Sequence, residues 1–145
     1  MRHGFTLPEL LLVLCLTGIL LLVVVPRIGQ WQDRIAIDNA ARRAVGAYGR
    51  ARLLAITRGQ KVTLLVTAES LTVRLPGDSL APSLWGALGP SADGVQLQEP
   101  AIRRASFVAT GLAWGVPNAT LVFRRGAATR SVVVSRLGRV RIRAP

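Results

Sequence analysis

An α+β fold is predicted for this chain: one long N-terminal helix, with a transmembrane half and an amphipathic half, packed on an antiparallel β-sheet domain. Three observations support this prediction. Residues 10–25 carry no charge, residues 37–55 repeat apolar side chains at spacings of three and four, and from residue 61 onward short apolar runs alternate with glycine-containing turns. These are the patterns of a membrane segment, an amphipathic helix and a series of strands.

The apolar segment is long enough to cross a membrane. As a helix, the 21 residues from Phe5 to Val25 would span roughly 31 Å, about the thickness of the hydrocarbon core of a bilayer. Arg2 fits a cytoplasmic N-terminus under the positive-inside rule, but several arginines also follow the segment. We assign residues 5–25 to the transmembrane part of the helix.

The amphipathic part of the helix covers residues 26–58. Its apolar stripe shares one helix face and consists of Ile37, Ala41, Ala44, Tyr48, Ala51 and Ala55. Pro26 is expected to kink the helix rather than end it, because helical periodicity resumes beyond it. Gly59 is suited to a C-cap, so we expect the helix to run from Leu7 to Thr57.

Residues 59–145 are expected to form the β-rich domain. Residues 61–67 and 71–75 predict a hairpin. Further strands are expected at 95–99, 106–110, 120–124, 130–135 and 139–143. Residues 76–94 are rich in Pro, Gly, Ser and Asp and predict a long loop.

The residue inventory argues against catalysis. His3 and Cys15 are the only histidine and cysteine, and both lie in the first 25 residues. The acidic residues beyond the apolar segment are scattered, without the spacing of a metal site or an acid–base pair: Asp33, Asp38, Glu69, Asp78, Asp93 and Glu99. We therefore expect no enzyme activity, no metal, no cofactor and no small-molecule substrate.

The chain is strongly basic, with 19 Lys plus Arg against 7 Asp plus Glu and a formal net charge of +12. Only Lys61 among these basic residues is not an arginine. Such a balance favours nucleic acid, anionic lipid headgroups or acidic protein surfaces as partners. Taken alone, the net charge is explained equally well by an anionic partner and by composition bias or solubility.

Glu9 lies close to the start of the apolar segment. A carboxylate in lipid is costly and usually has a specific partner, although the helix dipole also favours an acid in the first turn. A secretory signal peptide would end in a small-x-small cleavage site, and the run before Pro26 has none. An ordinary membrane anchor explains the length of the segment but not Glu9.

Residues 4–14, GFTLPELLLVL, resemble the prepilin processing signature of type IV pilins and type II secretion pseudopilins. The resemblance implies that a prepilin peptidase cuts between Gly4 and Phe5, that residues 1–4 are a leader, and that Phe5 becomes the N-methylated mature N-terminus. It also implies that Glu9 pairs with the N-terminal amine of a neighbouring subunit. A buried carboxylate needs such an opposite charge.

Residues 130–135, RSVVVS, and 138–142, GRVRI, are similar to the end of the GspH/FimT family of minor pseudopilins and minor pilins. The resemblance implies a single-pass inner-membrane protein with its C-terminal domain in the periplasm and other pseudopilins or pilins as partners. We expect a minor pseudopilin, a structural subunit of the type II secretion pseudopilus that takes part in protein export across the outer membrane.

A FimT-like type IV minor pilin that binds DNA through its basic C-terminal tail is the alternative. From residue 101 onward there are nine arginines and no acid, and Arg139, Arg141 and Arg143 would share one face of a strand. That face either contacts DNA phosphates or is a solvated outer strand whose charges discourage edge aggregation. The tryptophans are expected to anchor the core or an interface rather than to stack on bases: Trp31, Trp85 and Trp114.

Overall fold

The long helix forms as expected. A computed structural model describes residues 6–77, 82–98, 103–115, 119–135 and 137–143, and the chain divides into two compact units, residues 1–32 and 33–145. Helix α1 (Leu7–Arg58) has 52 residues and continues through position 26, so Pro26 does not end it. Gly59 follows with a left-handed φ of 63°, and its amide donates to the Ile56 carbonyl at 3.2 Å.

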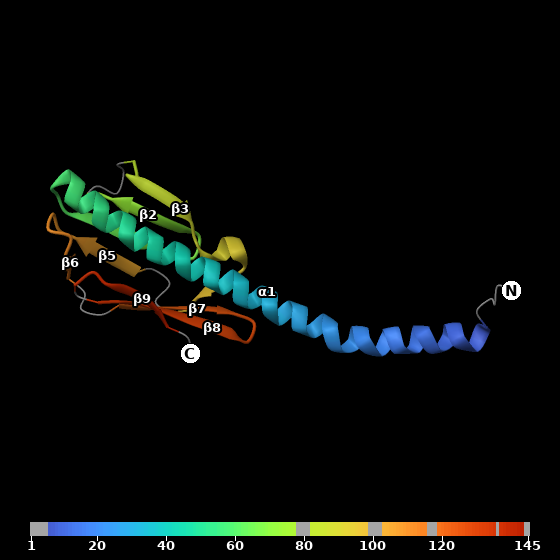
Figure 1. The fold of residues 1–145 in the computed structure, drawn as a ribbon. Helices are drawn as coiled ribbons and strands as arrows, with labels where there is room; N and C mark the ends of the chain where they lie inside the picture. The colour runs from blue at the N-terminus through green and yellow to red at the C-terminus, as the bar shows by residue number, and fades with distance from the viewer. Residues whose placement is uncertain (1–5, 78–81, 99–102, 116–118, 136, 144–145) are drawn as a thin grey trace. The chain divides into compact units, whose positions relative to one another are not determined.

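The strands form two antiparallel sheets (Figure 1). Sheet A consists, in spatial order, of β3 (Trp85–Leu88), β2 (Ser70–Arg74), β1 (Val62–Val66), β5 (Arg103–Phe107) and β6 (Ala113–Trp114). Sheet B consists of β4 (Gln96–Leu97), β7 (Ala119–Arg125), β8 (Ala128–Val134) and β9 (Val140–Arg143). The α+β prediction, with one helix followed by antiparallel strands, is therefore confirmed.

Two stretches differ from the prediction. The expected loop 76–94 contains strand β3, which pairs with β2, and a 3-10 helix, η1 (Pro90–Asp93). Glycines at positions 86 and 89 hide the alternation by which a strand is recognised. The strand expected at 106–110 lies earlier, as β5, because the chain turns at 108–111, where the Val108 amide donates to the Leu112 carbonyl at 3.0 Å.

The core of the second unit lies between the apolar stripe of α1 and the inner faces of both sheets. All six predicted stripe residues are buried. Alternate strand residues face them, among them Val62, Leu64 and Val66 from β1 and Leu121 and Phe123 from β7. Small residues on the helix let the sheets approach it closely, so the helix is held by packing rather than by its own propensity.

Tyr48 carries a buried hydroxyl in this core. Its ring meets Phe107 edge-to-face at a centroid distance of 6.3 Å, and its hydroxyl has no hydrogen-bond partner among the described residues. Burial raises the pKa of Tyr48 to about 12, and the nearby charge of Arg103 partly offsets that rise. The neutral form of the phenol is therefore favoured in the folded state.

A Tyr48→Phe variant is expected to be as stable as the parent at pH 7, or more stable by up to about 1 kcal/mol, because it removes an unsatisfied polar atom. Above pH 10 the unfolded phenol ionises before the folded one, so the parent should lose about 2–3 kcal/mol of stability as pH rises through 12. The variant should lack this loss. Thermal denaturation of both proteins in detergent across this range checks the prediction, and a large destabilisation of the variant at pH 7 would contradict it.

Candidate functional site

The N-terminal motif is only partly covered by the structure. Gly4 and Phe5, the predicted processing site, lie outside the described residues. Glu9 lies in the first turn of α1, exposed, and its Oε2 accepts a hydrogen bond from the backbone amide of Thr6 at 3.4 Å. This contact is half of a capping box, in which an acid at the third helical position satisfies a free amide at the helix start. Within one chain, Glu9 therefore acts as a cap.

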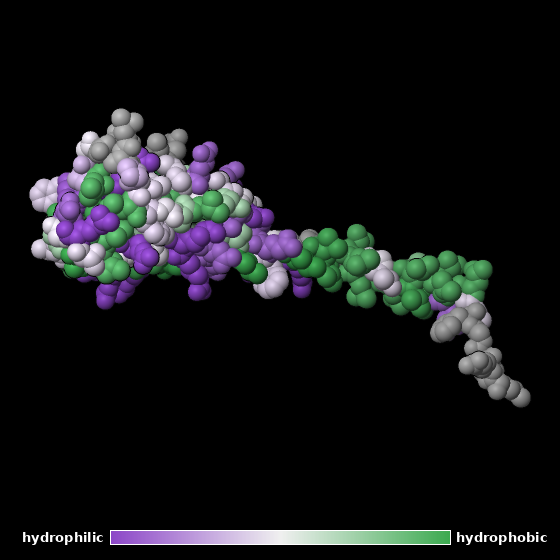
Figure 2. Space-filling view, turned by 90° about the horizontal axis from the view of Figure 1, so that it is seen from above, coloured by the Kyte–Doolittle hydropathy of each residue, from purple (hydrophilic) through white to green (hydrophobic). Residues whose placement is uncertain are grey.

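The helix surface around Glu9 is apolar and uncovered. Leucine, isoleucine and valine side chains from Leu7 to Val25 are about half exposed or more where the structure describes them, and they cover this part of α1 in Figure 2. This stretch is long and apolar enough to cross a membrane. The Thr17 hydroxyl donates a hydrogen bond to the Val13 carbonyl at 2.7 Å. The hydroxyl is therefore satisfied within the helix and needs no partner from another helix or from lipid.

The basic C-terminal strand lies at an edge of sheet B. Among the described strands, β9 pairs with β8 alone, with Arg141 opposite Val133 and Arg143 opposite Ser131. Because Val132 and Val134 of β8 face the core, Arg141 and Arg143 lie on the outer face of the sheet. Arg139 lies in the turn before β9, exposed, and its amide donates to the Ser135 hydroxyl at 3.1 Å.

Salt bridges that the sequence did not reveal join α1 to the sheet domain. The Arg125 Nε donates to Asp33 Oδ1 at 2.8 Å, and the Arg130 Nε donates to Asp38 Oδ1 at 2.7 Å. Arg43 of the helix pairs with Asp93 of η1. Acids that looked scattered in the sequence therefore have structural partners, and they do not gather into a metal or acid–base site among the described residues.

The tryptophans lie in two kinds of environment. Trp85 packs against the core. Trp31 and Trp114 are 64% and 61% exposed, so neither anchors the core, and their expected role at an interface stays a prediction. The Lys61 ammonium lies 5.4 Å from the centroid of the Trp114 ring, within the range of a cation–π contact.

A helix with an apolar first half and a second half packed on antiparallel sheets defines a pilin-like class of protein. FimU, a type IV minor pilin of Pseudomonas aeruginosa, has this fold: its crystal structure matches with a TM-score of 0.66 over 79% of this chain and 96% of FimU, at 19% sequence identity. A second crystal form of FimU matches with a TM-score of 0.62 at 18% identity, over 74% of this chain and 96% of FimU.

A comparison of sequences finds a relative with a higher sequence identity than FimU. The pilin-like protein PilA1 of Thermus thermophilus is 34% identical, over 97% of this chain and 98% of PilA1. No protein-family model matches the chain. The chain belongs to the type IV pilin-like proteins.

Proposed function

We propose that this protein is a minor subunit of a filament of the type IV class. It is held in the inner membrane by one pass of α1, with residues 59–145 in the periplasm. The observation that supports this best is the exposed apolar half of α1 with Glu9 as its only charge up to position 25. Each leucine or valine that leaves water contributes about 1.5–3 kcal/mol, so this surface requires lipid before assembly and neighbouring helices after it.

Processing at the N-terminus would supply the partner for Glu9. In this proposal prepilin peptidase cuts between Gly4 and Phe5, residues 1–4 are lost, and the N-methylated amine of Phe5 carries a positive charge. Glu9 can remain ionised among apolar helices only if a cation lies beside it, and the amine of a neighbouring subunit meets that need. The attraction between the two charges is much stronger there than in water.

Filaments isolated from lysed cell envelopes, together with surface filaments sheared from cells, test this proposal. The protein should be recovered in one of these filament fractions together with other filament subunits, and a membrane pool should remain in the cells. Recovery from membranes alone, with none in filaments from the same cells, would contradict the proposal.

Within this class we favour a minor pseudopilin of a type II secretion system. The support is the resemblance of residues 130–142, which lie on and between the paired strands β8 and β9, to the GspH/FimT family, whose members include minor pseudopilins as well as minor pilins. Deletion of the gene should then leave secreted proteins in the periplasm while surface pili still form. Loss of pili with normal secretion would favour a pilus subunit instead.

A DNA-binding minor pilin of a type IV pilus is the second candidate. The observation in its favour is the exposed outer position of Arg141 and Arg143, with Arg139 beside them in the turn.

If this tail binds DNA, the full chain in detergent should bind duplex DNA with an affinity that falls steeply as salt rises. Replacing Arg139 and Arg141 together by alanine should abolish the binding, because two phosphate contacts are lost. Gel-shift titrations at two salt concentrations measure the effect. Equal binding by the double variant and the parent would rule out the tail as the DNA site.

A further inference from the structure

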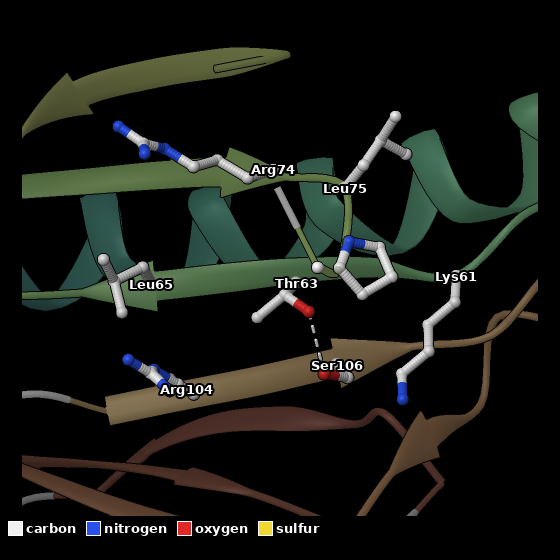
Figure 3. Close-up of a pocket in the computed structure, with 9 residues that line it drawn as sticks. Lys61, Thr63, Leu65, Arg74, Leu75, Arg104 and Ser106 are labelled. Carbon is white, nitrogen blue, oxygen red and sulfur yellow. Dashed lines mark hydrogen bonds between the residues drawn. The ribbon is translucent and has the colours of Figure 1, made fainter. Parts of the chain in front are cut away.

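The outer face of sheet A carries an open groove of about 520 Å³ (Figure 3). It lies entirely within the second unit, on the side of the sheet opposite the core. The groove is lined by Lys61, Thr63, Leu65, Arg74, Leu75, Pro76, Gly77, Arg104 and Ser106. Its wall therefore combines cations and hydroxyls with a small apolar surface.

Strand pairing fixes the arrangement of these side chains. Thr63 of β1 lies opposite Arg74 of β2 on one side and Ser106 of β5 on the other. The hydroxyls of Thr63 and Ser106 hydrogen-bond to each other at 3.0 Å in the middle of the groove. The next position on this face of β1, Leu65, lies opposite Arg104.

Lys61 and Arg104 lie at opposite ends of the groove, on either side of the hydroxyl pair (Figure 3). Each is two residues from that pair, in opposite directions along antiparallel strands. Their backbones are therefore roughly 14 Å apart along the strands, at about 3.4 Å per residue. Arg74 makes a contact of its own, and Lys61 and Arg104 are the two cations that we assign to a ligand.

No carboxylate belongs to the described lining of the groove. Elsewhere in this unit, salt bridges already neutralise three acids, Asp33, Asp38 and Asp93. Arg2, Arg27 and Glu9 are the only charged side chains before Asp33, so residues 33–145 hold 17 of the 19 basic residues, 6 of the 7 acidic ones and a net charge of +11. Two such surfaces repel each other, so a second copy is a poor occupant of the groove.

We infer that this groove binds an extended, carboxylate-bearing segment of a different protein. The partner would be another filament subunit with an acidic surface, and this identification of the partner rests on the proposed function. An extended chain places the side chains of alternate residues on one side. Two carboxylates four residues apart would reach Lys61 and Arg104, and a polar residue midway between them would lie over the hydroxyls of Thr63 and Ser106.

The lining favours a polypeptide over a nucleic acid. Single-stranded nucleic acid is held by aromatic side chains on which its bases stack, and the described lining contains none. Trp114 on neighbouring β6 already has the Lys61 ammonium over its ring. Leucine and proline side chains instead suit the mixed apolar and acidic surface of a protein segment.

Binding of a defined peptide to the full chain in detergent tests the inference. The probe is a fluorescent serine-rich peptide with two glutamates four residues apart and a serine midway. Its affinity should fall roughly five- to tenfold in the Lys61→Gln/Arg104→Gln double variant, because two partly solvated charge pairs are lost. It should also fall as salt rises.

A matched control removes the same charge elsewhere. Arg42→Gln/Arg50→Gln changes two exposed arginines on α1, and glutamine keeps the helix propensity of arginine. This variant should bind the peptide like the parent, and a peptide with adjacent glutamates should bind more weakly. An equal loss in both double variants would mean that net charge alone attracts the peptide, and it would overturn the inference.

Three further outcomes are decisive. Groove-dependent binding of an oligothymidylate strand, without binding of the peptide, would assign the groove to nucleic acid and contradict the inference. Failure of the peptide to bind, while the protein is still recovered in isolated filaments, would overturn the peptide-binding role of the groove and leave the filament role standing. Binding of the peptide by a protein that is absent from filaments would overturn the filament role and leave the peptide-binding groove standing.

Discussion

A Glu9→Gln variant is expected to enter the membrane normally and to disappear from isolated filaments. Glutamine keeps an acceptor for the Thr6 amide, so the helix start should remain capped. It cannot neutralise the amine of a neighbouring subunit, and a buried charge left without its partner costs on the order of 3–5 kcal/mol. Incorporation should therefore fall by about a hundredfold or more, as measured by immunoblots of isolated filaments normalised to the membrane pool.

The choice of glutamine separates two roles for the same carboxylate. If Glu9 matters only as a helix cap, Glu9→Gln should assemble nearly as well as the parent, since Gln also completes a capping box. If its charge matters, Glu9→Gln should be excluded from filaments as completely as Glu9→Leu. Glu9→Asp should retain part of the filament incorporation. Normal filament incorporation of the glutamine variant would show that pairing with an amine is not required.

A Gly89→Ala variant is expected to lose more than about 3 kcal/mol of stability or to fail to fold. Gly89 has an ordinary extended backbone, with φ −77° and ψ 179°, so alanine adds no backbone strain. An added Cβ would lie 2.4 Å from the Ala68 carbonyl oxygen and 2.5 Å from the Glu69 carbonyl carbon. That backbone cannot move away easily, because the Gly89 amide donates to the Glu69 carbonyl at 2.8 Å and the Ser91 amide donates to the Ala68 carbonyl at 2.9 Å.

Gly86→Ala is the matched control, three residues earlier in the same segment. A Cβ at Gly86 would meet its nearest atoms at 3.9 Å, an ordinary contact, so this variant should fold like the parent. Thermal unfolding in detergent should show a drop in melting temperature of more than about 10 °C for Gly89→Ala and almost none for the control. Similar melting temperatures for both variants would contradict the close backbone approach at position 89.

Local patterns predicted much of this fold because they arise within one element. The apolar stripe from Ile37 to Ala55 repeats with the helical period, and Gly59 marks the helix end in the sequence itself. The hairpin of β1 and β2 and the strands β7 and β8 were recognisable for the same reason, since their side chains alternate between core and solvent.

Features that depend on long-range pairing were not predictable. Strand β3 is recognised as a strand only once it pairs with β2, and the acids Asp33, Asp38 and Asp93 gain their arginine partners only in the folded domain. The groove on sheet A depends on a strand register that brings residues about forty positions apart side by side. By contrast, the processing motif and the arginine tail were recognised from sequence, and their roles remain predictions.

The most direct test of the filament account is the intact mass of the protein purified from its native membrane. The account predicts a chain that begins at Phe5, carries one methyl group on its amine and retains the whole apolar segment. A chain that still carries residues 1–4, or one cut near residue 25 and released as a soluble domain, would contradict it.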